Sequence, residues 1–139
     1  MVNKAYIDES CNRKYQKNFF NNYVFPYIKN NFSILNLGSG TNFILEEQIK
    51  SHFKNIFITD IDIIKCNKPT FVDEYKVHDL EKILILNRKY DLILSNEVIE
   101  HLDNTDNLLK SCYQNLNNNG TLILTFPNLS SIFCRLELS

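Results

Sequence analysis

Apolar positions recur with a helical period in the first thirty residues of the chain. Between residues 9 and 31 the aromatic and aliphatic side chains are spaced by three or four positions, which predicts an amphipathic helix. They are Tyr15, Phe19, Phe20, Tyr23, Val24, Tyr27 and Ile28. Pro26 lies inside this pattern. We expect it to bend or split the helix, because proline lacks the backbone N–H and its ring clashes with the preceding turn.

After residue 32, short apolar runs alternate with helical segments. The apolar runs predict strands at 33–37, 55–59, 75–77, 90–95 and 121–126. Helices are expected after residue 43 and over 104–116, and residues 65–73 should form a loop or a short helix. The continuous run "YDLILS" (90–95) is typical of a strand buried on both faces of a parallel sheet. Alternating strands and helices predict an α/β fold with a doubly wound, mostly parallel sheet.

Length and composition limit the classes of protein that fit. A chain of 139 residues without a linker or a repeat fits one core. Its 15 basic residues nearly balance its 16 acidic ones, which argues against a broad nucleic-acid or anionic-membrane footprint. No apolar run approaches the roughly 18 residues of a membrane helix.

The four cysteines are widely spaced: Cys11, Cys66, Cys112 and Cys134. They form no C-x-x-C motif, so they predict neither a zinc site nor a redox pair. In a chain without a secretory signal they are expected to be free thiols in a reducing compartment. We therefore predict a cytoplasmic protein without a metal.

Two of the three glycines of the chain lie in "ILNLGSGTNF", residues 34–43. Gly38 can adopt a positive φ angle, and Gly40 lets the backbone approach a ligand. A strand precedes the pair, a helix follows, and Asp60 lies about twenty residues on, where a carboxylate can accept both hydroxyls of a ribose. The alternative is that the glycines only turn the chain and Asp60 caps the next segment. Phe43 occupies the third position, where a dinucleotide site has glycine.

Two further polar segments follow predicted strands. Asp79, in "VHDLEK", is placed to accept from the exocyclic amine of an adenine. The strand 90–95 runs into "SNEVIEHL" (95–102), a polar cluster at the carboxyl edge of the sheet. Ligands of α/β proteins bind at that edge.

The segments "ILNLGSGTN", "ITDID", "VHDLEK", "YDLILSNEVIEHL" and "LNNNGTLILTFPN" occur in this order between about residues 33 and 135. On these motifs the chain resembles the class I S-adenosylmethionine-dependent methyltransferases of the small-molecule type, which include the ubiquinone-biosynthesis O-methyltransferases. The resemblance implies a Rossmann-like sheet. It also divides the chain into an N-terminal helical segment (1–32), expected to form a lid or cap, and a cofactor-binding core (33–139).

The resemblance implies which residues hold the cofactor. Gly38, Ser39 and Gly40 would surround its methionine part. Asn36 stands where the family usually has an acidic residue that contacts the amino group of the cofactor. An asparagine accepts a hydrogen bond there but loses the charge complementarity to an ammonium.

The adenosine part is expected to lie between the second and third strands. Asp60 would bind the ribose hydroxyls and Ile61 would pack against the adenine face. Asp79 would bind the adenine amine, and Leu80 would contribute its backbone amide.

The methyl group would be transferred next to the segment that follows residue 95. Asn96 would line the pocket near the sulfonium, with Glu97 and His101 close to the methyl group. A base is needed where the acceptor is a hydroxyl, and His101 is the candidate. The alternative is that His101 only caps or packs this segment. Glu97, Glu100 and His101 lack further ligands at metal spacing, so no metal is predicted.

The family has two more strands after "TLILTF". Residues 129–138 have length for only one short helix, so we expect a sheet that lacks part of its C-terminal strands. The strand 121–126 would then lie near an open apolar edge. The tail helix, a second copy of this chain or a partner subunit would cover it, or the chain is a fragment of a longer enzyme.

The leading functional prediction is methyl transfer to a small-molecule, lipid-linked or glycan acceptor, by O-methylation, with S-adenosylhomocysteine as product. The first alternative is a catalytically idle cofactor-binding subunit that needs a partner chain. The second is a nicotinamide-dependent oxidoreductase, against which the absent third glycine speaks. A nucleic-acid methyltransferase is disfavoured because the segment after the fourth strand lacks a Pro-Pro-Tyr-like sequence.

Overall fold

A computed structural model describes residues 9–127 of the chain as a three-layer α/β fold. Its central sheet has the strand order β3-β2-β1-β4-β5, and every neighbouring pair is parallel. The strands are β1 (Ser33–Leu37), β2 (Phe57–Asp62), β3 (Glu74–Val77), β4 (Tyr90–Asn96) and β5 (Leu116–Thr125). The chain order reverses between β1 and β4, which makes their carboxyl ends the expected ligand position.

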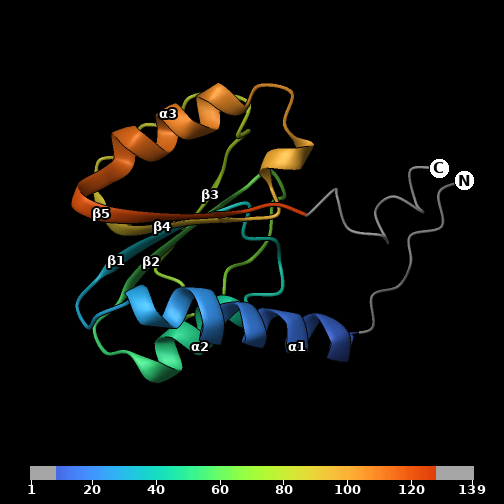
Figure 1. Ribbon diagram of the computed structural model, residues 1–139, viewed down its shortest axis with the longest axis vertical. Coiled ribbons are helices and arrows are strands. Elements are labelled where there is room, and N and C mark those ends of the chain that lie inside the picture. Colours follow the sequence, from blue (N-terminus) through green and yellow to red (C-terminus); the bar gives the residue numbers. More distant parts are fainter. Residues whose placement is uncertain (1–8, 128–139) are drawn as a thin grey trace, which may run out of the picture.

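The helices cover both faces of the sheet. Figure 1 shows α1 (Glu9–Phe19) and α2 (Ile44–His52) on one face and α3 (Thr105–Asn115) on the other. The predicted doubly wound, parallel α/β fold is therefore confirmed. Within residues 9–127 no helix is long and apolar enough to cross a membrane.

The N-terminal helical segment changes its winding before it ends. After α1 the chain forms a π-helical turn, Phe20–Val24, and then a 3-10 turn, Phe25–Tyr27, in which Pro26 occupies an early position. Ile28 is extended. The expected disruption at Pro26 is thus observed.

The same segment contributes to the core of the sheet. Phe20 and Val24 are fully buried and belong to one cluster with residues of β1, β2, β4 and α2. A second cluster fills the other face, below α3. The division at residues 32 and 33 therefore separates a helical segment from the sheet and does not separate two cores.

The central strands are buried on both faces, as the apolar pattern predicts. In β1, Ile34 packs on the side of α1 and α2, and Leu35 packs on the side of α3. In β4, Leu92 packs on the side of α1 and α2, and Ile93 packs on the side of α3. The prediction for "YDLILS" is therefore confirmed.

Strand β2 differs from its predicted range. It was expected over 55–59 but runs from Phe57 to Asp62. It pairs with β1 on one side and with β3 on the other, and Asp60 lies opposite Asn36 and Tyr75. The carboxyl end of the strand is consequently three residues later than predicted.

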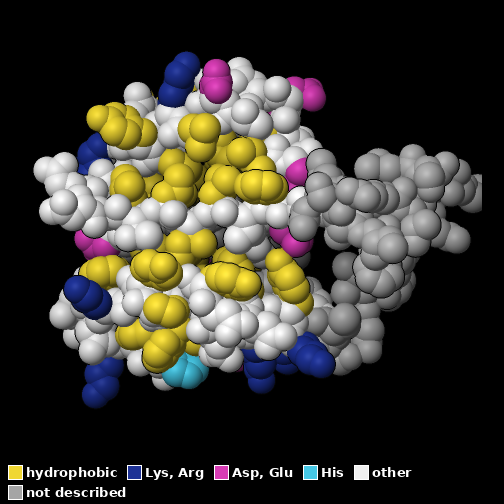
Figure 2. Space-filling model, in the orientation of Figure 1, with side chains coloured by type: hydrophobic (Ala, Val, Ile, Leu, Met, Phe, Trp, Pro, Cys, Tyr) yellow, Lys and Arg dark blue, Asp and Glu magenta, His cyan; other side chains and the backbone are white. Residues whose placement is uncertain are grey.

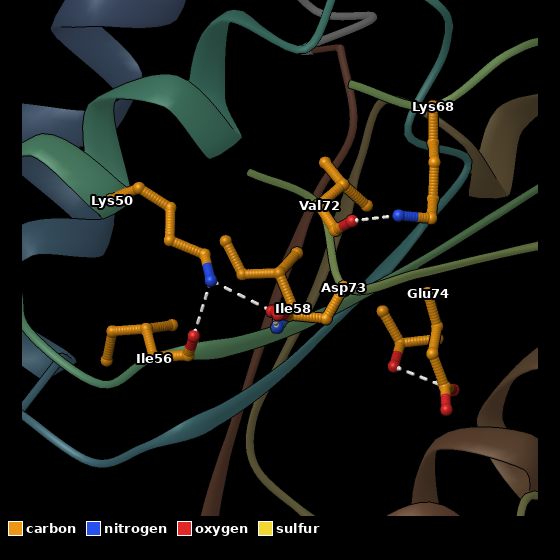
Figure 3. Close-up of polar contacts among 8 residues, drawn as sticks. Lys50, Ile56, Ile58, Lys68, Val72, Asp73 and Glu74 are labelled. Atoms are coloured by element: carbon orange, nitrogen blue, oxygen red, sulfur yellow. Dashed lines mark hydrogen bonds and ion pairs between the residues drawn. The ribbon is translucent and has the colours of Figure 1, made fainter. Parts of the chain in front are cut away.

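A lysine of α2 fixes the amino-terminal end of β2 (Figure 3). Lys50 Nζ donates to the carbonyl oxygen of Ile56 at 2.6 Å and lies 2.9 Å from Asp73 Oδ2. The same carboxylate oxygen accepts from the backbone N–H of Ile58 at 2.7 Å. Helix α2, strand β2 and the approach to β3 are therefore held together at the end opposite the polar edge.

Strand β5 is one of the two edge strands of the sheet in the described part of the chain, and β3 is the other. All residues of β5 are partly or fully exposed. Leu122, Ile123 and Leu124 pack partly against the two clusters, and Phe126 beyond it is 65% exposed. Figure 2 shows hydrophobic side chains gathered on the face of the molecule where β5 lies. The predicted tail helix, 129–138, falls outside the described residues.

Candidate functional site

The loop after β1 requires glycine at two positions for different reasons. Gly38 has φ +73°, and a Cβ atom there would lie 2.3 Å from Val98 Cγ2. Gly40 has φ +69°, but a Cβ atom there would meet nothing within 4 Å. Both positions therefore favour glycine through the backbone angle, and Gly40 in addition borders open space.

A pocket of about 380 Å³ opens beside this loop, within the size range of small-molecule sites. It is formed by residues at the carboxyl ends of β1, β2, β3 and β4. These are Gly38, Asp62, Ile63, His78, Asp79, Leu80, Glu81, Glu97, Val98, His101 and Leu102. Five of the predicted site residues therefore come together here: Gly38, Asp79, Leu80, Glu97 and His101.

Asp60 and Ile61 do not line this pocket, and their contacts with the cofactor stay predictions. Asp60 is fully buried, and Ile61 is fully buried in the cluster below α3. Strand β2 is longer than predicted and ends at Asp62. Asp62 and Ile63 line the pocket. The motif "ITDID" contains two acidic residues, and the predicted strand ended before the first of them.

Asp62 already joins two loops. Its Oδ2 accepts from the backbone N–H of Gly40 at 2.8 Å, and its Oδ1 accepts from that of Ile64 at 3.0 Å. A carboxylate has about four acceptor positions, so two remain for a ligand. The backbone N–H groups of Gly38 and Ser39 both donate to Ile61 O, which holds the glycine loop against β2.

The loop after β3 is held by hydrogen bonds to the segment before α3. Asp79 Oδ1 accepts from the backbone N–H of Glu81 at 3.0 Å. The two carboxylate oxygens of Glu81 accept from the backbone N–H groups of Asp103 (2.7 Å) and Asn104 (2.8 Å). This wall of the pocket is therefore built by contacts that the spacing of residues along the chain does not reveal.

A smaller cavity of about 50 Å³ lies next to the pocket, and Gly38 borders both. Its lining is Gln16, Asn36, Gly38, Ser39, Asn42, Leu45, Glu46 and Asn96. Three further predicted site residues, Asn36, Ser39 and Asn96, are therefore found here. Gly40 lines neither cavity. Four lining residues were not predicted: Gln16, Asn42, Leu45 and Glu46.

Helix α1 reaches the segment that follows β4. Tyr15 Oη donates to Glu97 Oε1 at 2.9 Å and lies 3.4 Å from Asn96 Oδ1. Partial burial and the Glu97 carboxylate raise the pKa of Tyr15. The helix therefore borders the site, and its function as a lid or cap stays a prediction.

His101 lies at the end of the 3-10 turn Ile99–His101. Its side chain is 76% exposed, and its Nε2 is 3.9 Å from Glu100 Oε1. The ring thus borders both the pocket and solvent. In residues 9–127 no group of three or more metal-binding side chains occurs.

Comparison with known proteins assigns the chain to a family. A family described as "Methyltransferase domain" matches residues 6–137, which is nearly the whole chain. The chain belongs to this methyltransferase family. The predicted methyltransferase class, whose cofactor is S-adenosylmethionine, and its Rossmann-like fold are thereby confirmed.

Similar proteins differ in what they methylate. A malonyl-[acyl-carrier protein] O-methyltransferase of Bacillus cytotoxicus is 37% identical over 103 residues, which are 68% of this chain and 35% of that protein. The structure of the plantazolicin methyltransferase, with S-adenosylhomocysteine bound, has a TM-score of 0.69 at 23% identity and covers 91% of this chain and 51% of its own. The structure of coclaurine N-methyltransferase, also with S-adenosylhomocysteine bound, has a TM-score of 0.64 at 23% identity. The match covers 78% of this chain and 35% of that one. The chain thus spans about a third of the length of the Bacillus relative.

Proposed function

We propose that this chain binds S-adenosylmethionine in the pocket beside the glycine loop and transfers its methyl group to a small-molecule, lipid-linked or glycan acceptor. The observation that carries the proposal is the open space at Gly40, next to a pocket into which the ends of β2, β3 and β4 bring carboxylates. A ligand backbone can approach Gly40 closely, and hydroxyl and amine donors can reach the carboxylates. The residues present therefore fit the cofactor of the family.

We assign the adenosine part of the site to residues of β2 and β3. Asp62 is proposed, in place of Asp60, to accept the ribose hydroxyls, and Ile63 is proposed, in place of Ile61, to pack against the adenine. Ile63 is 68% exposed, so it has free surface for this contact. Asp79 and Leu80 keep their predicted functions at the adenine amine and through the backbone amide.

The methyl-transfer end is proposed to lie at the segment after β4, near Asn96, Glu97 and His101. When bound, S-adenosylmethionine supplies a methyl group on a sulfonium, which is a good leaving group. The protein then has to hold the acceptor in line with that methyl group, so positioning provides most of the acceleration. Tyr15 supports this positioning because its hydrogen bond to Glu97 joins α1 to the wall of the site.

We propose an oxygen atom as acceptor. Support comes from the Bacillus relative, which is named as an O-methyltransferase. A hydroxyl acceptor needs a base, and the exposed ring of His101 at the pocket wall can take the proton. A carboxylate acceptor is already ionised and needs no base. The effect of removing His101 therefore distinguishes the two kinds of oxygen acceptor.

The proposal is tested by calorimetric titration of the chain with S-adenosylhomocysteine, with NAD as the control ligand. Binding of the first ligand alone is expected. Asp62→Ala should weaken that binding at least tenfold, because the ribose loses its acceptor. Binding of NAD alone would instead favour the oxidoreductase alternative and overturn the proposal.

A second candidate is an idle cofactor-binding subunit that works only with a partner chain. The exposed residues of β5 support it, because an open apolar strand is a surface for a second copy or another protein. Tight binding of S-adenosylhomocysteine without methyl transfer to a broad panel of acceptors would favour this candidate.

A further inference from the structure

Two carboxyl groups are buried side by side next to the glycine loop, and the proposed function does not use them. Glu46, in the first turn of α2, is 1% exposed, and Asp60, in β2, is 0% exposed. Asn36 of β1 lies opposite Asp60 in the sheet, and its Nδ2 donates to Glu46 Oε1 at 2.5 Å. Three elements therefore contribute one polar cluster to an otherwise apolar layer.

The described residues provide no cation for this pair. None of their ion pairs includes Glu46 or Asp60. Lys50, in the same helix as Glu46, is held by Asp73 (Figure 3), and Arg13 of α1 pairs with the neighbouring Glu47. A buried carboxylate without a partner is costly, so the pair calls for a proton or a positively charged ligand.

A single proton keeps the pair at one negative charge. Burial and the charge of Glu46 raise the pKa of Asp60 to about 9, so Asp60 holds the proton of the pair at neutral pH. Burial also raises the pKa of Glu46, against the hydrogen bond from Asn36. The other titratable groups acting on Asp60 are Asp62 in the same strand and Tyr75 in β3.

Glu46 also lines the small cavity of about 50 Å³. The remaining polar lining comes from the side chains of Gln16, Asn36, Asn42 and Asn96 and from Ser39, none of which carries a charge. A water molecule occupies about 30 Å³ in the liquid, so the cavity has room for one small polar group. Gly38 borders this cavity and the main pocket, so a ligand in the pocket can extend an end into the cavity.

We propose that Glu46 binds the α-ammonium of the methionine part of the cofactor in this cavity, while Asp60 holds the proton of the pair. The inference rests on the proposed function, because it requires the adenosine part to occupy the main pocket. The family usually has an acidic residue at the position of Asn36. In this chain the negative charge comes from α2 instead, and Asn36 orients it through a hydrogen bond.

The arrangement is selective for a ligand with one positive charge. The singly charged pair and an ammonium neutralise each other in a site from which water is excluded, where such an interaction is stronger than in solvent. Adenosine compounds that lack the α-amino group of the methionine part would leave the Glu46 carboxylate without its counter-ion. They should therefore bind through the main pocket alone.

Calorimetric titration of the folded chain and of Glu46→Gln with two ligands tests this inference. The ligands are S-adenosylhomocysteine and 5′-methylthioadenosine, which lacks the amino-acid part. Glu46→Gln should weaken binding of the first at least tenfold and leave binding of the second within about twofold. The matched control is Glu47→Gln, which changes an exposed acid on the same helix and should affect neither ligand.

A second comparison begins with the unmodified chain, so its first measurement does not depend on how the variant folds. In the unmodified chain, an S-adenosylhomocysteine analogue with hydrogen in place of the α-amino group should bind at least tenfold more weakly than the parent compound. In Glu46→Gln the two should bind alike, because the ammonium has lost its partner.

The outcomes separate the inference from the proposed function. If the unmodified chain binds both adenosine ligands and Glu46→Gln binds S-adenosylhomocysteine equally well, the inference is wrong and the proposed function stands. If Glu46→Gln weakens both ligands alike, Glu46 acts through the fold, and the inference is again wrong. If neither ligand binds the unmodified chain, the proposed function fails and the inference fails with it.

Discussion

Replacing Asp60 with asparagine should stabilise the protein, and the gain should increase with pH. Asp60 is fully buried, and its pKa is raised from 3.8 to about 9 by burial and by the charge of Glu46. Asparagine has nearly the same shape and is neutral at every pH. Neither carboxyl oxygen of Asp60 has a hydrogen-bond partner within residues 9–127, so the substitution removes an ionisable group without breaking a side-chain hydrogen bond.

The direction of this pH dependence follows from the number of protons that the folded and unfolded states bind. Between pH 4 and pH 9 the folded protein holds a proton on Asp60 that the unfolded chain has released. Rising pH therefore lowers the free energy of unfolding, by about 1.4 kcal/mol for each pH unit in this window. Between pH 5 and pH 8 the expected loss is at most about 4 kcal/mol, and Glu46, whose pKa is also raised, acts in the same direction. In Asp60→Asn the free energy of unfolding should fall less with rising pH, because position 60 no longer ionises.

Urea unfolding at pH 5 and pH 8 measures this difference. With a slope of about 2 kcal/mol per molar urea, a change of about 4 kcal/mol moves the midpoint by about 2 M. Asp60→Asn should therefore unfold at a higher urea concentration than the unmodified chain at pH 8, and the difference between the two should be about 2 M smaller at pH 5. Glu47→Gln, at an exposed position, should follow the unmodified chain. An equal pH dependence in the unmodified chain and in Asp60→Asn would refute the reasoning.

Three further variants test the site. Asp62→Ala should lose at least tenfold in affinity for S-adenosylhomocysteine and should also lower the melting temperature, because it removes two hydrogen bonds to loop backbone N–H groups. An unchanged affinity would remove Asp62 from the ribose site. His101→Ala should keep that affinity but lose methyl transfer to a hydroxyl acceptor, as followed by S-adenosylhomocysteine release, and undiminished transfer would assign His101 a structural role. Gly38→Ala should destabilise the fold by about 1–3 kcal/mol, because its Cβ would lie 2.3 Å from Val98 Cγ2 at a positive φ angle. Chemical denaturation measures this loss, and a stability equal to that of the unmodified chain would contradict the crowding at Val98.

Strands with uninterrupted apolar runs could be predicted from the sequence. The bounds of β1 were predicted correctly, and those of β3 and β4 to within one residue. Their burial between neighbouring strands and helices requires apolar side chains at nearly every position, so the pattern is visible locally. Strand β2 was misjudged because two of its last three residues are acidic, although they are buried. An acidic residue in a strand lowers its apparent propensity, but pairing with β1 and β3 on both sides outweighs this.

Contacts between distant segments left no signal in the sequence. Tyr15 and Glu97 are 82 positions apart, and no periodicity relates them. Glu81 likewise binds the segment before α3 through backbone N–H groups, and any residue type other than proline supplies such a donor. Such walls of a site follow from the tertiary arrangement, so only the structure can identify them.

The buried carboxyl pair is the clearest departure of this chain from the rules that predict the rest of it. The segment "EEQ" (46–48) reads as the solvent face of a helix, yet Glu46 is 1% exposed and Glu47 beside it is exposed. A buried acidic side chain without a cation lowers the stability of the fold. Departures of this kind are expected at functional sites, where the residue serves the activity of the protein. The gain in stability expected for Asp60→Asn measures what the buried acids cost the fold. The loss of affinity expected for Glu46→Gln measures what they contribute to cofactor binding. If the ammonium were bound by Asn36 alone, Asp60→Asn would still stabilise the protein, but Glu46→Gln would not weaken cofactor binding.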